Sequence, residues 1–258
     1  MAKHVDLKGL EIKTALRNAP FESKDILEIG CGDGRLTFKY ARKAHRVVAV
    51  DPSAASIETA SRNTPKSLAS KLIFRVGRGE ELGDYQAKSF DVVFFTWSLC
   101  CTSIPVMGRA LDEAWRVLRR DGVLVNIQPS LHQPFRSGAL TYLVKGKFGT
   151  TVDDERYRQS RLALKYKSLV EGRFELLGEE EFPVKTAYDT VEDVIDDLKC
   201  GAREQYDSLD EKTKRRIHDE LASRRTGGSI IMIENAVLTV LRKQESRTQP
   251  LRKGRTVG

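Results

Sequence analysis

Residues 26–34 read Ile26-Leu27-Glu28-Ile29-Gly30-Cys31-Gly32-Asp33-Gly34, an apolar run that passes directly into a glycine-rich turn. A short apolar run bounded by a turn predicts a buried strand. Glycine lets the backbone approach a ligand more closely than any side chain allows. The helix behind such a turn presents unpaired N–H groups that suit an anionic group. This stretch therefore predicts a strand, a ligand-binding turn and a helix.

Four further apolar runs, at 47–50, 72–76, 91–95 and 123–127, alternate with segments of helical periodicity. In the clearest of these segments, Met107, Ala110, Leu111 and Ala114 recur at the spacing of one helix face. Apolar strands separated by helices indicate a parallel sheet covered on both faces. We expect an α/β fold with a doubly wound, mostly parallel sheet. Residues 230–241 are expected to form its last strand, antiparallel to its neighbour.

The polar features of this pattern fall where the predicted strands end. They are the glycine turn, Asp51, the Gly77–Glu80 turn and Thr96. Ligands of open α/β sheets bind at the carboxyl ends of the strands. An acid at Asp51 can accept hydrogen bonds from two ribose hydroxyls, which suits either a nicotinamide cofactor or S-adenosylmethionine (SAM). The turn has glycines at every second position, whereas dinucleotide enzymes space them as GxGxxG.

The chain resembles the class I SAM-dependent methyltransferases, in particular their type 11 group. Beyond residues 26–34, the resemblance lies in Val50-Asp51-Pro52-Ser53, in residues 89–93, in Ser98-Leu99 and in residues 114–124. These motifs occur in the order and at the spacing of that family, and they cover roughly residues 25–128. The resemblance implies the doubly wound, seven-stranded, mostly parallel, Rossmann-like sheet of that family. It also implies an enzyme of class EC 2.1.1 that uses SAM and releases S-adenosylhomocysteine.

The resemblance also implies roles for individual residues. Glu28 and the glycine turn would hold the methionine end of SAM, Asp51 the ribose, and Pro52 the adenine face. Gly79 and Glu80 would lie at the adenine edge, and Thr96 near the methyl group. Arg78 stands where the family often has an acid, and Cys100 and Cys101 where it often has histidines. The implied cofactor-binding residues are Glu28, Gly30, Cys31, Gly32, Gly34, Asp51, Pro52, Gly79, Glu80 and Thr96.

Methyl transfer from a sulfonium needs mainly alignment of the reactants. A general base is required only when the acceptor must lose a proton. The weak candidates for that base are His132, just after the fifth strand, and Tyr142, and Trp97 is expected to shape the pocket wall. The sequence therefore predicts the cofactor site more firmly than the catalytic residues.

We expect a single methyltransferase domain over residues 1–241. Its core spans 25–128, an inserted cap spans approximately 130–185, and C-terminal helices and the last strand span 190–241. Residues 242–258 carry six basic residues against one acid and are expected to form a disordered basic tail. The segment 133–167 is also basic, which favours an anionic acceptor. The chain lacks the Asn-Pro-Pro-Tyr and Pro-Cys motifs of nucleic-acid methyltransferases, so a small-molecule acceptor is expected and nucleic acid is not favoured.

Other classes of protein fit the sequence less well. No apolar run reaches the roughly 20 residues of a membrane span, and residues 1–6 lack an apolar signal core. The four cysteines form no CxxC pair, so we expect no metal site and a cytoplasmic location with reduced thiols. The alternatives are a SAM-binding regulatory or partner protein without transfer activity, an RNA methyltransferase and, less favoured, a nicotinamide-dependent oxidoreductase.

Overall fold

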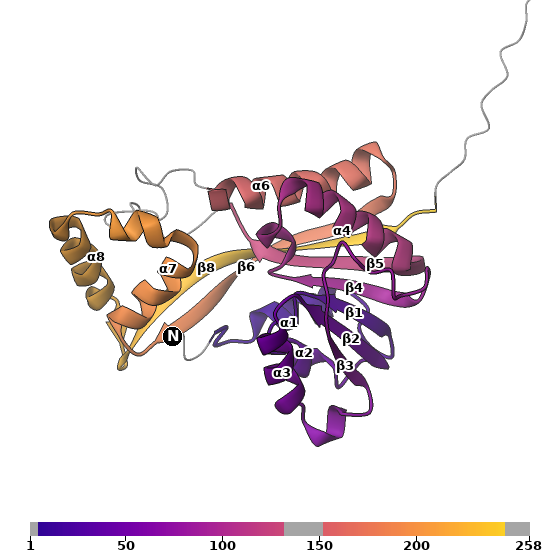
Figure 1. Cartoon of the computed structure of the whole chain (residues 1–258), viewed down its shortest axis with the longest axis horizontal. Helices are drawn as coiled ribbons and strands as arrows, with labels where there is room; N and C mark the ends of the chain where they lie inside the picture. The colour runs from indigo at the N-terminus through magenta and orange to yellow at the C-terminus, as the bar shows by residue number, and fades with distance from the viewer. Residues whose placement is uncertain (1–4, 132–151, 246–258) are drawn as a thin grey trace, which may run out of the picture.

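The computed structural model describes residues 5–131 and 152–245, which form an α/β fold around one large sheet (Figure 1). The strand order is β3-β2-β1-β4-β5-β8-β6, with a short β7 paired to β8. The first five strands of this order are parallel, and β8 is antiparallel to both β5 and β6. The expected mostly parallel sheet with a late antiparallel strand is confirmed.

The parallel strands are β1 (Asp25–Ile29), β2 (Arg46–Asp51), β3 (Leu72–Val76), β4 (Phe90–Thr96) and β5 (Leu118–Pro129). In β1, β2 and β4 the central residues are buried on both faces, as their unbroken apolar sequences require. The strand at the edge, β3, is more exposed and carries an arginine. Because these five strands are parallel, their carboxyl ends lie at the same edge of the sheet.

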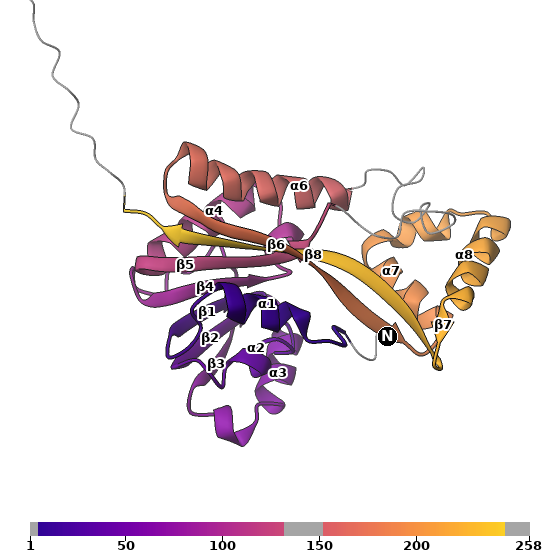
Figure 2. The same cartoon turned by 180° about the vertical axis from the view of Figure 1, so that it is seen from behind.

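Helices cover both faces of the sheet (Figure 2). One face packs against α1 (Leu10–Asn18), α2 (Thr37–Tyr40) and α3 (Ala54–Arg62), and we call its buried residues the α1-side core. The other face packs against α4 (Ile104–Val117) and α6 (Val152–Lys165). Short helical turns lie at Lys66–Leu68 (η1), Leu99–Cys101 (η2) and Tyr166–Val170 (η3). The helix expected behind the glycine turn is only the four-residue α2, because the chain turns repeatedly before Thr37.

Two strands extend well beyond the rest of the sheet. β6 (Phe174–Tyr188) and β8 (Ser229–Lys243) have 15 residues each and pair along their whole length. Only the second half of β8 also pairs with β5. The remaining ribbon projects past the carboxyl edge and carries β7 (Arg225–Thr226), α7 (Val191–Asp207) and α8 (Glu211–Ser223) at its far end (Figure 1).

The ribbon corrects one expectation about domain layout. The cap predicted over approximately 130–185 is too long, because residues 174–185 belong to β6 and are hydrogen-bonded into the sheet. This strand lacks the alternating pattern that reveals a half-buried strand, since charged residues occupy several consecutive positions from Glu179. Within the described residues, no helix is both long enough and apolar enough to cross a bilayer.

Candidate functional site

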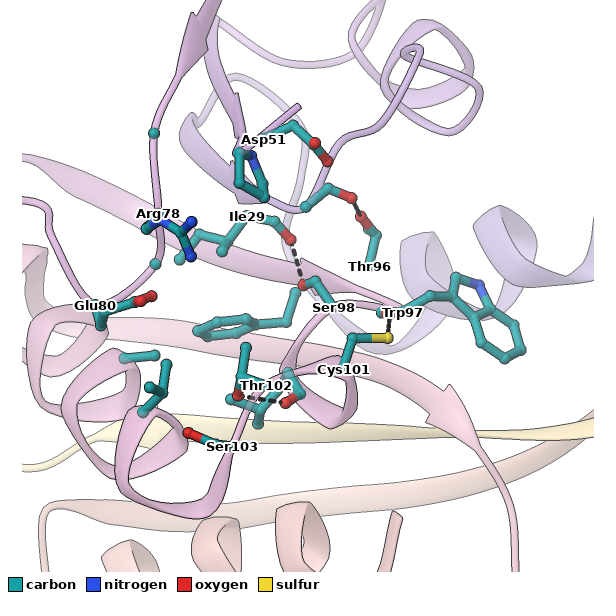
Figure 3. Close-up of a pocket in the computed structure, with 18 residues that line it drawn as sticks. Ile29, Asp51, Arg78, Glu80, Thr96, Trp97, Ser98, Cys101, Thr102 and Ser103 are labelled. Carbon is teal, nitrogen blue, oxygen red and sulfur yellow. Dashed lines mark hydrogen bonds between the residues drawn. The ribbon is translucent and has the colours of Figure 1, made fainter. Parts of the chain in front are cut away.

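A cavity of about 510 Å³ opens at the carboxyl edge of the parallel strands (Figure 3). It lies over the ends of β1, β2 and β4, between the turn after β3 and the start of α4. Its volume falls in the range of about 300–1,000 Å³ typical of small-ligand sites. The lining residues are Ile29, Gly30, Asp51, Pro52, Gly77, Arg78, Gly79, Glu80, Phe95, Thr96, Trp97, Ser98, Leu99, Cys101, Thr102, Ser103, Val106 and Ala110.

Gly30 closes the floor of the cavity where β1 and β4 end side by side. Its φ is +80°, a left-handed conformation that L side chains rarely adopt. A Cβ at this position would lie 2.1 Å from the Cβ of Ser98. The Ser98 hydroxyl donates a hydrogen bond to the carbonyl of Ile29 at 2.5 Å, so the two chain segments are fixed in close approach. The positive φ of Gly30 and the lack of room for a Cβ beside Ser98 therefore both require glycine at this position.

Gly30→Ala is expected to weaken cofactor binding by at least tenfold and to lower the free energy of unfolding by about 1–3 kcal/mol, the usual cost of backbone strain. The cause is the clash with Ser98. Titration calorimetry with S-adenosylhomocysteine and urea denaturation measure the two effects. Gly83→Ala is the matched control, since a Cβ there meets nothing within 4 Å. If Gly30→Ala and Gly83→Ala bind S-adenosylhomocysteine with equal affinity, Gly30 does not form the floor of the cofactor site.

Asp51 ends β2 and lies at the rim of the cavity (Figure 3). One carboxylate oxygen accepts a hydrogen bond from the backbone N–H of Gly32 at 2.9 Å, and the other accepts one from Ser53 at 2.9 Å. Ionised carboxylate oxygens have about four acceptor positions in all, so two remain for a ligand. Asp51 thus supports the glycine turn and keeps capacity for two hydroxyl groups.

Glu28 lies beneath the floor and does not line the cavity. It is fully buried and accepts hydrogen bonds from the hydroxyls of Thr37 at 2.6 Å, Tyr40 at 2.8 Å and Thr96 at 3.1 Å. Burial raises the pKa of Glu28, and these three donors oppose that rise. Thr96 is also 2.9 Å from the carbonyl of Gly30.

Glu28→Gln is expected to lower the free energy of unfolding by less than Glu28→Ala, because the amide keeps polar atoms beside the hydroxyls of Thr37, Tyr40 and Thr96. Glu28→Ala should cost about 3 kcal/mol, because it leaves buried hydroxyls unpaired and opens a cavity. Urea denaturation of both variants tests this. A loss for the glutamine variant as large as that for alanine would show that the charged form is the one required.

The turn after β3 forms the wall opposite Asp51. Gly79 is buried, and a Cβ there would lie 2.8 Å from the Ile29 side chain, so the backbone packs directly on the end of β1. Arg78 and Glu80, on either side of Gly79, also line the cavity (Figure 3). The arginine that departs from the family pattern is therefore a cavity residue.

The loop after β4 is held in place by α1. Trp97 has a φ of +58° and donates its indole N–H to Glu11 at 2.5 Å, with its ring directed away from the cavity (Figure 3). The Arg35 guanidinium donates to the two oxygens of Glu11 at 2.5 and 2.9 Å. Glu11 is completely buried. One carboxylate thus joins α1, the glycine turn and the loop that lines the cavity.

The cavity brings together most, but not all, of the residues singled out in the sequence. Gly30, Asp51, Pro52, Gly79, Glu80 and Thr96 line it, and so does Trp97. Glu28, Cys31, Gly32 and Gly34 do not: Glu28 and Cys31 are buried below it, and Gly32 acts through its bond to Asp51. His132 and Tyr142 lie outside the described residues.

The lining residues that sequence reasoning missed come from the end of β4 to the first half of α4. They include Phe95, Ser98, Leu99, Thr102, Ser103, Val106 and Ala110. Most are apolar or small, so no chemical signature marks them. Ala110 belongs to the apolar face that was assigned to the core, where it also packs. Within residues 5–131 and 152–245, no group of three metal-ligating side chains is found.

Sequence comparison identifies one family. Residues 27–126 match the family described as a methyltransferase domain. The magnesium-protoporphyrin O-methyltransferase of Rhodobacter capsulatus is 36% identical over 88 residues, which are 34% of this chain and 38% of that protein. The ubiquinone biosynthesis O-methyltransferase of Methylocella silvestris is 37% identical over 93 residues, 36% of this chain and 35% of that protein. The matches thus span little more than a third of these relatives' length.

Solved structures share the fold over nearly the whole chain. A Bacillus halodurans protein assigned as a methyltransferase superposes with a TM-score of 0.61 at 18% identity, covering 92% of this chain and all of that one. A geranyl diphosphate methyltransferase in complex with SAM gives a TM-score of 0.55 at 13% identity, covering 92% and 86% of the two chains. At these identities the structural likeness concerns the fold.

Proposed function

From the premise that this chain carries a class I SAM-dependent methyltransferase domain of the type 11 group, we propose that it transfers a methyl group from SAM to a small-molecule acceptor. The observation that carries the proposal is the cavity at the carboxyl edge, where Asp51, Gly30 and Gly79 come from three different strand ends. Most curated relatives matched over this same core are O-methyltransferases, and one is a C-methyltransferase. We infer a hydroxyl oxygen as the acceptor atom.

The residues present suit SAM in shape and in hydrogen bonding. Gly30 and Gly79 have no room for a Cβ, so their backbone can form the surface of a narrow cradle. Asp51 retains acceptor capacity for two ribose hydroxyls, and Pro52 offers a flat apolar surface beside it. Ile29, Phe95 and Val106 supply apolar contacts for an adenine. When bound, SAM supplies an activated methyl group on a positively charged sulfur.

The protein's own part in the reaction is alignment and exclusion of water. Holding two reactants in line is worth about 7–11 kcal/mol of the barrier when the geometry is fixed in advance. The bond network of Glu11 with Arg35 and Trp97 fixes the loop between the cavity and α1. This network holds Trp97 at its positive φ. The backbone N–H of Trp97 also donates a hydrogen bond to the carbonyl of Ile127 at 2.9 Å.

The anionic acceptor and the cytoplasmic location expected from the sequence remain predictions. Of the basic segment 133–167, Arg161 pairs with Glu179, and Lys167 pairs with Asp112 and Glu171. Neither lines the cavity. A SAM-binding protein without transfer activity and an RNA methyltransferase remain the competing functions.

Titration calorimetry with SAM and S-adenosylhomocysteine tests the cofactor site, and formation of S-adenosylhomocysteine with a panel of hydroxyl compounds tests transfer. Micromolar binding of both cofactor forms with turnover of at least one small hydroxyl compound is expected. Absence of binding would overturn the proposal. Binding with turnover of RNA alone would favour the RNA methyltransferase, and binding without turnover of any acceptor would favour the regulatory protein.

A further inference from the structure

The turn after β3 places Arg78 between two fixed points of the cavity, and the first of these is Asp51. Val76, the last residue of β3, pairs with Asp51, and the N–H of Gly77 donates to the carbonyl of Asp51 at 3.1 Å. The carbonyl of Arg78 accepts a bond from the N–H of Glu81 at 3.1 Å. The backbone just before Arg78 is therefore one strand spacing, about 4.8 Å, from Asp51.

Gly79 is the second fixed point. A Cβ at Gly79 would lie 2.8 Å from the Ile29 side chain and 3.6 Å from that of Ala110. The backbone of Gly79 itself therefore forms the wall of the cavity, and the side chains of Arg78 and Glu80 leave it on either side. Both side chains line the cavity, and Figure 3 shows both directed towards the other lining residues. The wall is thus bare backbone flanked by a guanidinium and a carboxylate.

Both of these charged groups are available for a ligand. Within residues 5–131 and 152–245, the side chains of Arg78 and Glu80 form no hydrogen bond or ion pair, either with each other or with any other residue. Arg78 is exposed and Glu80 is half-buried, so water can reach both groups. Asp51, by contrast, already accepts two backbone hydrogen bonds. A ligand in the cavity can therefore use the full bonding capacity of Arg78 and Glu80.

The two groups complement the rim of an adenine. A guanidinium can only donate hydrogen bonds and an ionised carboxylate can only accept them, so this wall offers a donor and an acceptor a single residue apart. Adenine presents the matching pair, an amino group that donates and ring nitrogens that accept. A 6-oxo purine held in the same orientation by Asp51 would instead turn an oxygen towards the carboxylate. The wall therefore suits adenine better than its 6-oxo counterpart.

We propose that Arg78 and Glu80 together select the base of the cofactor. Arg78 donates a hydrogen bond to a ring nitrogen of adenine, and Glu80 accepts one from the 6-amino group. This inference rests on the proposed function, because it takes Asp51 to hold the ribose of SAM. The resemblance to the type 11 group leads to the expectation of an acid at position 78. In this chain the acceptor is Glu80, and Arg78 adds a donor that an ionised acid cannot supply.

Arg78→Ala tests the donor. We expect this variant to bind S-adenosylhomocysteine at least tenfold more weakly than wild type, because a hydrogen bond from a charged donor is worth about ten- to hundredfold in affinity. Titration calorimetry measures the loss. Arg109→Ala is the matched control, since it removes the same charge from an exposed site on α4 that does not line the cavity. Wild-type affinity in Arg78→Ala would overturn the proposal.

Ligands that lack one ring nitrogen separate a direct bond from a general effect of charge. The 1-deaza, 3-deaza and 7-deaza forms of S-adenosylhomocysteine each carry C–H in place of one nitrogen. We expect one of the three to bind wild type and Arg78→Ala with equal affinity, because the bond to Arg78 is already missing. The other two should lose affinity in Arg78→Ala as the parent compound does. An equal loss for all four compounds would show that Arg78 forms no bond to the base and would overturn its role.

S-inosylhomocysteine tests the acceptor, because its base carries an oxygen in place of the amino group. We expect wild type to bind it at least tenfold more weakly than S-adenosylhomocysteine, the worth of one hydrogen bond to a charged group. In Glu80→Gln the amide can donate as well as accept, so the two compounds should bind with nearly equal affinity. Glu81→Gln is the matched control, since Glu81 does not line the cavity, and it should keep the wild-type ratio. The wild-type ratio in Glu80→Gln would overturn the proposal.

Two measurements separate this role from loss of fold and from failure of the proposed function. The melting temperatures of Arg78→Ala and Glu80→Gln should equal that of wild type, because neither side chain bonds to another residue of the described chain. If wild type itself fails to bind S-adenosylhomocysteine, the proposed function fails. If wild type binds it and both variants bind every compound as wild type does, only the selection of the base by Arg78 and Glu80 fails.

Discussion

Replacing Asp51 with alanine is expected to weaken SAM binding by a hundredfold to a thousandfold, the largest effect of any single cavity substitution. Hydrogen bonds to an ionised carboxylate contribute about 1.5–3 kcal/mol each, and each 1.4 kcal/mol is tenfold in affinity. If the proposed function holds, the substitution removes the two acceptor positions that Asp51 offers to the ribose hydroxyls. It also frees the N–H of Gly32, which Asp51 now holds at 2.9 Å, so the glycine turn loses support as well.

Titration calorimetry with S-adenosylhomocysteine measures this loss, and Asp51→Asn divides it into parts. The asparagine keeps one acceptor oxygen without the charge, so its affinity should lie between those of wild type and alanine. Glu58→Ala is the control, since this exposed carboxyl on α3 pairs with Arg62 on the same helix. Wild-type affinity in Asp51→Ala would place the cofactor elsewhere.

Replacing Glu11 with alanine is expected to lower the free energy of unfolding by about 3 kcal/mol, the cost of removing one partner from a buried ion pair. The guanidinium of Arg35 and the indole N–H of Trp97 would both lose their acceptor. Trp97 would keep its backbone bonds to Ile127 and to the Cys101 thiol but lose the anchor of its ring, so the loop after β4 should loosen. Acceptor KM should rise together with the loss of stability.

Urea denaturation and the fluorescence maximum of Trp97 measure these effects. Trp97→Phe removes a single hydrogen bond and should cost about 1 kcal/mol. Glu58→Ala breaks an exposed i, i+4 pair and should cost no more than about 0.5 kcal/mol. The proposed network requires that Glu11→Ala lose the most free energy of unfolding, Trp97→Phe less, and Glu58→Ala the least. A Glu11 variant as stable as the Glu58 control would rule it out.

The parallel half of this fold was predictable because its central strands are buried on both faces. A short, unbroken apolar run such as Val47–Val50 is typical of a strand buried on both faces. Asp51 then falls at the carboxyl end of that strand. The antiparallel half was less predictable. β8 was found because its apolar run is long, whereas β6 was missed because Glu179, Glu180 and Glu181 follow one another at the sheet edge.

The site divides in the same way. Gly30 and Asp51 were predictable because each belongs to a short local motif that indicates its role. Glu11 was not, because its role comes from a contact with Trp97, 86 residues further along the chain. Ser98 was quoted only as part of the family pattern. Its closeness to Gly30 depends on the pairing of β1 with β4, which no single segment encodes.

The projecting ribbon has a consequence for how such a protein can diversify. α7 and α8 have their own apolar cluster and join the sheet only through its two outermost strands, far from Asp51 and Gly79. Sequence changes in α7 and α8 can therefore alter the outer surface of the ribbon while leaving untouched the strand ends that form the cavity. Two parts of one continuous sheet are thus able to vary independently of each other.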